Sequence, residues 1–221
     1  MLQELDLLIK SSEHDYVISM IGICETNTSL LVVLQDVKMT LKNMLLESRQ
    51  RDLQNNKFCL LPENKLLEIC ANVACGMEYL HSFGLSCNRP LHSTPDYTRW
   101  TSHEMLRQTR YNPKADVWSF GCLMWEVFTL GGTPYSHTVN KDVAARVLRG
   151  MRPSQPSYVG DELFQLCLQC WQVDPDERPT FTSLVHEVVP FADGPGSRCL
   201  SLTYYNGFNY EPHIPEFEII S

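Results

Sequence analysis

The stretch DVWSFGCLMWEVFTLGGTPY at residues 116–135 decides the fold of this chain. Most of it belongs to a predicted helix over residues 113–130, in which apolar side chains occur on every side and not along one stripe. These side chains are Val117, Trp118, Phe120, Leu123, Met124, Trp125, Val127, Phe128 and Leu130. A helix of this kind outside a membrane must be buried all round, so we expect it at the centre of a helical domain. The Gly131-Gly132-Thr133-Pro134 cluster is expected to end it.

Further helices are predicted on both sides of this segment. They cover residues 42–46, 62–81, 140–148, 161–171 and 180–189. Asp161 and Thr180 stand where N-cap residues are favoured, and Pro190 is expected to end the last helix. The pattern therefore predicts an all-helical region of considerable length.

The front of the chain has a different pattern. Residues 1–10 are predicted to form an amphipathic helix, and two strands are predicted over residues 16–24 and 30–34. A two-stranded ribbon is marginal alone, so we expect exposed apolar surface there. The fold class is therefore α+β, mainly α. The expected domains are residues 1–37, 38–191 and 192–221, the last being a tail.

Composition excludes several classes of protein. The 221 residues carry a formal net charge of −8 and no basic run, which argues against a nucleic-acid partner. No apolar run reaches the roughly 18 residues that a membrane-spanning helix needs, and the first residues lack the features of a signal peptide. The nine cysteines suit a reducing compartment. Cys167 and Cys170 form a C-x-x-C on one helix face without partners for a metal site, so no metal is expected.

Five segments, in the same order along the chain, resemble protein tyrosine kinases of the receptor type. They are residues 1–24, NVACGMEYLHS at 72–82, RWTSHEML at 99–106, residues 116–135, and CWQVDPDERPTF at 170–181. The resemblance implies a kinase-like helical C-lobe with a residual C-helix and two strands of the N-lobe. The tail segment EPHIPEFEII at residues 211–220 is similar to that of a receptor-like inactive tyrosine kinase with a WSC domain.

The residues that perform phosphoryl transfer in that family are not matched. The family uses a glycine-rich loop, a strand lysine, metal ligands on an Asn and the D-F-G Asp, and a catalytic Asp in H-R-D. This chain starts at the C-helix, so Glu4 matches the C-helix glutamate without its lysine partner. Arg89 or Pro90 stands at the position of the catalytic Asp, and roughly thirty residues that include D-F-G are missing. Asp96, the one acid between Leu80 and Trp100, is interpreted as a turn residue.

Structural family positions are retained. Glu104 and Arg178 match the glutamate and arginine that the family pairs inside the helical lobe, against the alternative of two independent surface charges. Asp116 matches the aspartate that steadies the catalytic loop, and with that loop shortened it is expected to serve as a helix cap. His103 replaces the family's proline before Glu104, which puts the substrate-positioning segment in doubt. His81 is expected to be a packed polar residue.

Two functions follow from this reading. The first is a catalytically inactive signalling scaffold or allosteric binding module, with no ATP site, cofactor or metal. The alternative is a partial or mis-spliced form of an active receptor tyrosine kinase, which would use ATP and magnesium. Tyr204 and Tyr210 are candidate phosphotyrosines for SH2 adaptors, against the alternative that this aromatic stretch packs onto the domain. The expected location is the cytoplasmic side, with membrane association as part of a longer receptor.

Overall fold

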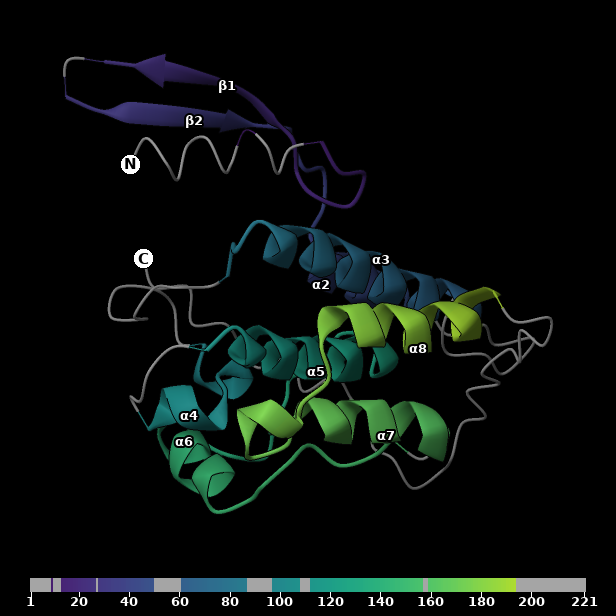
Figure 1. Cartoon of the computed structure of the whole chain (residues 1–221). Helices are drawn as coiled ribbons and strands as arrows, with labels where there is room; N and C mark the ends of the chain where they lie inside the picture. Colours follow the sequence, from purple (N-terminus) through teal and green to yellow (C-terminus); the bar gives the residue numbers. More distant parts are fainter. Residues whose placement is uncertain are drawn as a thin grey trace.

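The computed structural model describes residues 9, 13–26, 28–49, 61–86, 97–107, 112–156 and 159–193. The elements in these ranges are β1 (Met20–Glu25), β2 (Leu30–Leu34), α2 (Leu41–Glu47), α3 (Glu63–Ser82), η1 (Thr98–Trp100), α4 (His103–Leu106), α5 (Lys114–Phe128), α6 (Asn140–Leu148), α7 (Asp161–Cys170), η2 (Pro175–Glu177) and α8 (Phe181–Asp193). This content confirms the predicted class, mainly helical with one two-stranded sheet. The helices pack together, and the β-ribbon stands apart above α3 (Figure 1).

Helix α5 forms the centre of the helical region, as its sequence predicts. None of its residues is exposed, and Trp118, Cys122 and Val127 have no accessible surface. It packs between α3 and α7. The turn after α5 uses Gly131, whose φ of 83° lies in the left-handed region and whose N–H donates to the Glu126 carbonyl at 2.7 Å. The predicted end of the helix is therefore confirmed to within two residues.

Helix α7 approaches α5 closely at Gly121. A Cβ atom at this position would lie 2.7 Å from Cys170 Cβ and 2.8 Å from the indole nitrogen of Trp171. Only glycine leaves room for these two side chains. The C-x-x-C pair lies at this contact, with the Cys167 and Cys170 thiols buried and free. Burial raises the pKa of both thiols, so they remain protonated packing groups at neutral pH.

Helices α3 and α8 lie side by side and close the core on the side nearest the ribbon (Figure 1). The Thr180 hydroxyl accepts the Ser183 N–H at 3.1 Å, which confirms the predicted N-cap of α8. The predicted stop at Pro190 is wrong, because α8 continues to Asp193. A proline in the last turn removes only one intrahelical donor. Asp161 is not a cap either: Gly160 occupies the N-cap of α7 and no side chain caps it.

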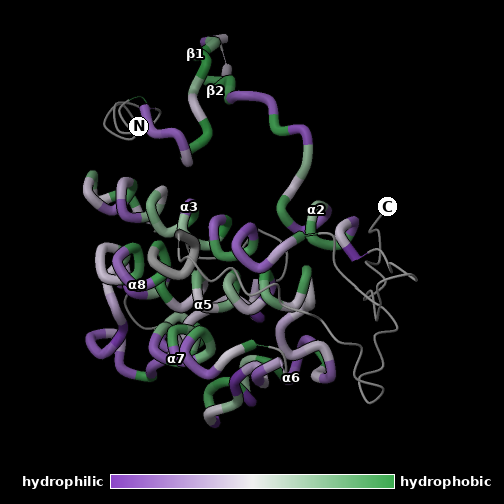
Figure 2. Tube along the Cα trace, turned by 90° about the vertical axis from the view of Figure 1, so that its right-hand side faces the viewer, coloured by the Kyte–Doolittle hydropathy of each residue, from purple (hydrophilic) through white to green (hydrophobic). Residues whose placement is uncertain are grey.

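The β-ribbon exposes apolar side chains on both of its faces. Strands β1 and β2 pair antiparallel, with Ile23 opposite Val32. All residues of β2 are exposed, from 37% for Leu30 to 54% for Leu31. Figure 2 shows these apolar strands projecting from the helices. β1 starts at Met20 and not at residue 16 as predicted, because residues 13–17 form a turn in which the Val17 N–H donates to the His14 carbonyl.

Candidate functional site

The residues singled out by sequence fall into two groups. Glu104, Asp116 and Arg178, with His81 and His103, lie in the described helical region. The others lie outside the described residues: Glu4, Arg89, Pro90, Asp96, Tyr204 and Tyr210.

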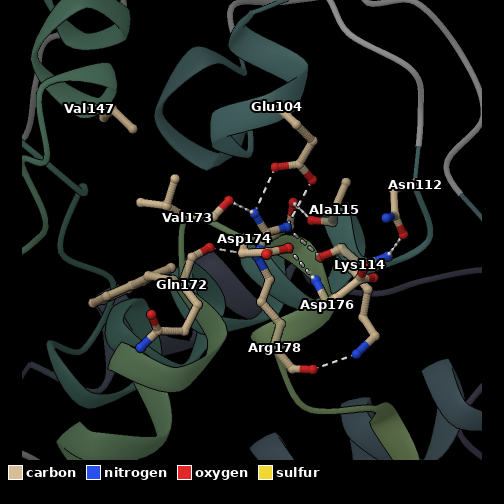
Figure 3. Close-up of polar contacts among 12 residues, drawn as sticks. Glu104, Asn112, Lys114, Ala115, Val147, Gln172, Val173, Asp174, Asp176 and Arg178 are labelled. Atoms are coloured by element: carbon tan, nitrogen blue, oxygen red, sulfur yellow. Dashed lines mark hydrogen bonds and ion pairs between the residues drawn. The ribbon is translucent and has the colours of Figure 1, made fainter.

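Glu104 of α4 and Arg178, next to η2, form a two-pronged ion pair (Figure 3). One guanidinium nitrogen of Arg178 donates to Glu104 Oε1 at 2.8 Å, and the other donates to Oε2 at 2.6 Å. The side chain of Arg178 is fully buried and that of Glu104 is 12% exposed. The two residues are therefore an interior pair and not two surface charges.

Backbone carbonyls satisfy the remaining donors of Arg178. Its Nε donates to the Gln172 carbonyl at 2.9 Å, and one terminal nitrogen donates to the Lys114 carbonyl at 2.9 Å. The Lys114 ammonium in turn donates to the Arg178 carbonyl (Figure 3). Arg178 thus connects α4, the start of α5 and the segment after α7. A buried charge is tolerated only when it is paired and hydrogen-bonded in this way.

The ionisation of Glu104 reflects two opposing effects. Burial raises the pKa of its carboxyl, but the hydrogen bonds and positive charge of Arg178 outweigh burial, so the pKa lies below its usual value. The carboxylate is therefore charged at neutral pH. Removing either partner would leave an uncompensated charge inside the lobe, which costs about 3–5 kcal/mol.

A half-buried arginine, Arg152, was not identified from sequence. Its guanidinium lies 4.4 Å from the centre of the Trp118 ring, and that of Arg178 lies 5.1 Å from the same ring. Arg152 also donates to the Trp171 carbonyl at 3.1 and 3.2 Å. Burial is the main reason that its pKa is lowered, although it remains a cation. Trp118 is thus contacted by two cations that come from distant parts of the sequence.

Asp116 lies in the first turn of α5 and binds a histidine. Its Oδ2 is 3.0 Å from His81 Nε2, near the end of α3. His81 also makes an edge-to-face contact with Phe181, with ring centres 4.9 Å apart. The expectation that Asp116 acts as a cap is wrong: Pro113 is the N-cap, and Asn112 Oδ1 accepts the Lys114 N–H. His81 is a packed polar residue, as predicted.

The segment that in the family positions the substrate is held firmly to its neighbours. Arg99 donates to the carbonyls of Pro134, Tyr135 and Thr138 at 2.7–2.8 Å. The Trp100 indole N–H donates to Glu126 Oε2 at 2.6 Å. These bonds fix η1 against α5 and the loop before α6, so this segment is rigid scaffold.

His103, which stands where the family has proline, is buried at the start of α4. Burial lowers the pKa of its imidazole, and the charges of Arg107 and Arg152 lower it further, while Glu104 opposes them. His103 is therefore neutral at pH 7. A neutral, buried imidazole beside cations packs as a side chain and is not placed to take up a proton.

No three His, Cys, Asp or Glu side chains of the described ranges are grouped so that they could hold a metal ion. No helix in the described part of the chain is long and apolar enough to cross a bilayer. The Asp116 carboxylate is bonded to His81.

Comparisons with a family model and with individual proteins indicate the same family. The family model described as protein tyrosine and serine/threonine kinase matches residues 1–86 and 86–188. The two matched segments meet at Ser86, the last described residue before the segment that leads to η1. The match therefore covers both the ribbon and the helical lobe.

Individual relatives agree with this match. Vascular endothelial growth factor receptor 1 of Mus musculus is 37% identical over 139 residues, which is 58% of this chain and 10% of the receptor. Tyrosine-protein kinase Fer of Homo sapiens is 30% identical over 216 residues, 85% of this chain and 25% of Fer. Wsck of Drosophila melanogaster, whose name describes it as an inactive tyrosine-protein kinase, is 28% identical over 252 residues, all of this chain and 32% of Wsck. The chain spans about a third or less of these relatives.

Proposed function

Since this chain belongs to the protein tyrosine and serine/threonine kinase family, we propose that it is a catalytically inactive member whose helical lobe acts as a signalling scaffold or allosteric binding module. One observation carries this proposal. Only residues 83–97 join α3 to η1, whereas the family places H-R-D, a metal-binding Asn, D-F-G and the activation loop between the corresponding elements.

The chemistry of phosphoryl transfer explains why this difference is decisive. The reaction depends on positioning the nucleotide and on neutralising the charge that develops on the transferred group, chiefly through metal ions. By the resemblance to the family, Arg89 or Pro90 stands at the position of the catalytic Asp, and Asp96 is not followed by Phe-Gly. A chain without these groups has nothing to hold the metal ions or to aim the attacking hydroxyl.

The arrangement of Asp116 supports the same conclusion. In the family this aspartate steadies the backbone of the catalytic loop, and here its carboxylate is bonded to the His81 ring at 3.0 Å. The scaffold residues Glu104 and Arg178 keep their ion pair. Retention of the scaffold beside loss of the catalytic segment is the pattern expected of a lobe that binds partners.

Phosphoryl transfer by the purified chain tests the proposal. The chain is incubated with γ-labelled ATP, magnesium or manganese, and a tyrosine copolymer, beside an active tyrosine kinase as a positive control. We expect no label in the copolymer or in the chain itself. Labelled phosphotyrosine that forms in proportion to the concentration of the chain would overturn the proposal.

A second candidate is a partial or mis-spliced form of an active receptor tyrosine kinase. It is favoured by the two family matches that meet at Ser86, because good matches on both sides of a sharp break are typical of a lost coding segment. Transcripts across the codons of Leu85 to Trp100 separate the candidates. Reads that restore H-R-D and D-F-G support the second candidate, and a gene whose transcripts all lack these codons contradicts it.

Signalling by this chain would require protein partners, and the cytoplasmic side is the location that we propose, as for receptor kinases. SH2 adaptors are proposed for phosphorylated Tyr204 and Tyr210. Peptides around each tyrosine, phosphorylated and unphosphorylated, serve as bait. Capture of an SH2 protein by the phosphorylated form alone supports this, and equal capture by both forms contradicts it.

A further inference from the structure

A groove of about 720 Å³ begins at His81 and extends away from its contact with Asp116. Its walls come from the turn at residues 13–17, the second half of α3 and the start of α8. It is large enough for more than a single side chain. Since these three segments are far apart in the sequence, the groove could not be recognised from a motif.

The wall formed by the turn is held rigidly on α3. The Tyr16 N–H donates to His14 Nδ1 at 3.2 Å, and the His14 ring stacks on Tyr79 with ring centres 4.5 Å apart. A Cβ atom at Gly76 would lie 3.0 Å from the Tyr16 carbonyl oxygen, so the helix has a glycine where the turn rests on it. The Tyr16 ring is therefore held in place although it is 52% exposed.

The groove is acidic and contains no described cation. Glu78 carries the one formal charge among its described lining residues when the histidines are neutral, and none of these residues is lysine or arginine. Within the described ranges no ion pair involves Glu78. Aromatic rings and hydroxyl groups make up much of the remaining lining, among them Tyr16, Ser82 and Thr182.

This combination selects one ligand chemistry. A carboxylate beside an exposed aromatic ring attracts a cation, because the ring face is electron-rich and the carboxylate is negative. A guanidinium fits best, since it stacks on rings and offers several N–H donors to carboxylate and hydroxyl oxygens. A phosphate or a nucleotide is disfavoured, because none of the described residues that line the groove is lysine or arginine.

The geometry points to a binding site for an arginine-containing segment of a protein partner, with the guanidinium between Tyr16 and Glu78. This inference rests on the proposed function, in which the chain binds protein partners, and it names the chemistry of one such contact. The net charge of −8 would also attract a basic segment from a distance.

A capped pentapeptide, acetyl-Gly-Ser-Arg-Ser-Gly-amide, tests the site on the full chain by nuclear magnetic resonance titration. Its control contains citrulline, which has nearly the shape of arginine without the charge. We expect saturable shifts of the Tyr16, Glu78 and Thr182 amides with the arginine peptide, and binding weaker by about tenfold or more with the citrulline peptide. Equal shifts with both peptides, or shifts confined to other residues, would overturn the inference.

Two variants distinguish binding at the groove from nonspecific attraction of the peptide to the negatively charged chain. Glu78→Gln should weaken binding of the arginine peptide by about tenfold. Glu68→Gln, which removes the same charge elsewhere on α3 where Glu68 pairs with Lys65, should leave binding unchanged. Equal weakening by both variants contradicts a specific site. Tyr16→Ala is a second variant at the groove and should also weaken binding.

The outcome is distinguishable from that of the proposed function. If the arginine peptide fails to bind and the chain still transfers no phosphate, the groove inference is wrong and the inactive-scaffold proposal stands. If the chain transfers phosphate, the proposed function fails whatever the peptide does.

Discussion

The helical lobe and the β-ribbon of this chain differ in which side chains they bury. In the lobe, even charged groups are interior, and Arg178 is fully buried with every side of its guanidinium occupied. In the ribbon, apolar residues such as Ile21 and Leu31 are 68% and 54% exposed. The lobe is therefore expected to carry the stability of the chain, and the ribbon to contribute little of its own.

The comparison also separates two kinds of family residue. Those that survive in the lobe, Glu104 and Arg178, connect elements to one another. In the family, the catalytic Asp and the metal ligands lie between the elements that correspond to α3 and η1, and here residues 83–97 join these two elements. The Glu104–Arg178 pair is made within the helical lobe, so it does not depend on the segment between α3 and η1.

The largest effect is expected for Arg178→Ala. It leaves the Glu104 carboxylate nearly buried without its partner, so the free energy of unfolding should fall by about 3–5 kcal/mol. Urea unfolding monitored by tryptophan fluorescence measures this loss. The matched control is Lys65→Ala, which removes a surface pair with Glu68 and should cost at most about 0.5 kcal/mol. A loss below 1 kcal/mol for Arg178→Ala would show that the interior pair does not hold the lobe together.

A second pair of variants adds one methyl group to the helical lobe and one to the β-ribbon, by replacing a glycine with alanine in each. Gly121→Ala inserts a Cβ atom 2.7 Å from Cys170 Cβ, which forces α5 and α7 apart and should cost about 1–3 kcal/mol. Gly22→Ala in β1 meets no atom within 4 Å and should change stability by less than about 1 kcal/mol, in the stabilising direction. The same urea titration serves for both variants. Similar losses for the two would contradict the contrast between lobe and ribbon.

Acidification should weaken the lobe in two steps. The pKa of His103 is lowered, so the unfolded chain binds a proton more readily and stability falls as the pH drops below about 6.5. The pKa of Glu104 is also lowered, so a further loss begins below about 4.5 and continues as the pH falls through the pKa of the folded state. Each unit by which a pKa is lowered corresponds to about 1.4 kcal/mol.

His103→Gln isolates the upper step, since glutamine does not titrate. The free energy of unfolding is measured from pH 8 to pH 4. In this variant it should no longer change with pH between pH 7 and pH 5, while the loss caused by protonation of Glu104 at lower pH remains. If the free energy of unfolding changes with pH between pH 7 and pH 5 as much as in the unmodified chain, a group other than His103 causes this change.

The smallest effect on stability is expected in the ribbon. Leu31→Lys replaces a side chain that is 54% exposed, so the unfolding free energy should change by no more than about 0.5 kcal/mol. The same change should reduce self-association, because an exposed apolar edge strand favours edge-to-edge pairing between molecules. Light scattering at increasing protein concentration measures the self-association. Strong destabilisation by Leu31→Lys would mean that the ribbon is part of the cooperative core.

Sequence predicted the lobe well because its signals are local and strong. The all-round apolar pattern of α5 requires burial whatever surrounds it. The resemblance to tyrosine kinases also indicated the pairing of Glu104 with Arg178. Pro190 misled the prediction of the end of α8, because a proline in a last turn is tolerated more easily than one in the middle.

Other features could not be predicted because they depend on contacts between distant segments. Trp118 and Arg152 meet only once α5 and the loop after α6 are packed. The turn that delays the start of β1 exists because residues 13–17 rest on Gly76 of α3. The groove lined by Tyr16 and Glu78 likewise requires three segments that no periodicity connects.

The most direct test of the central claim, that this lobe is folded but has no working nucleotide site, is a thermal unfolding titration of the purified chain with ATP and magnesium. A ligand that binds the folded state raises the midpoint as its concentration exceeds the dissociation constant. The account predicts a single cooperative transition whose midpoint does not change up to millimolar ATP. A saturable rise that requires magnesium would contradict it.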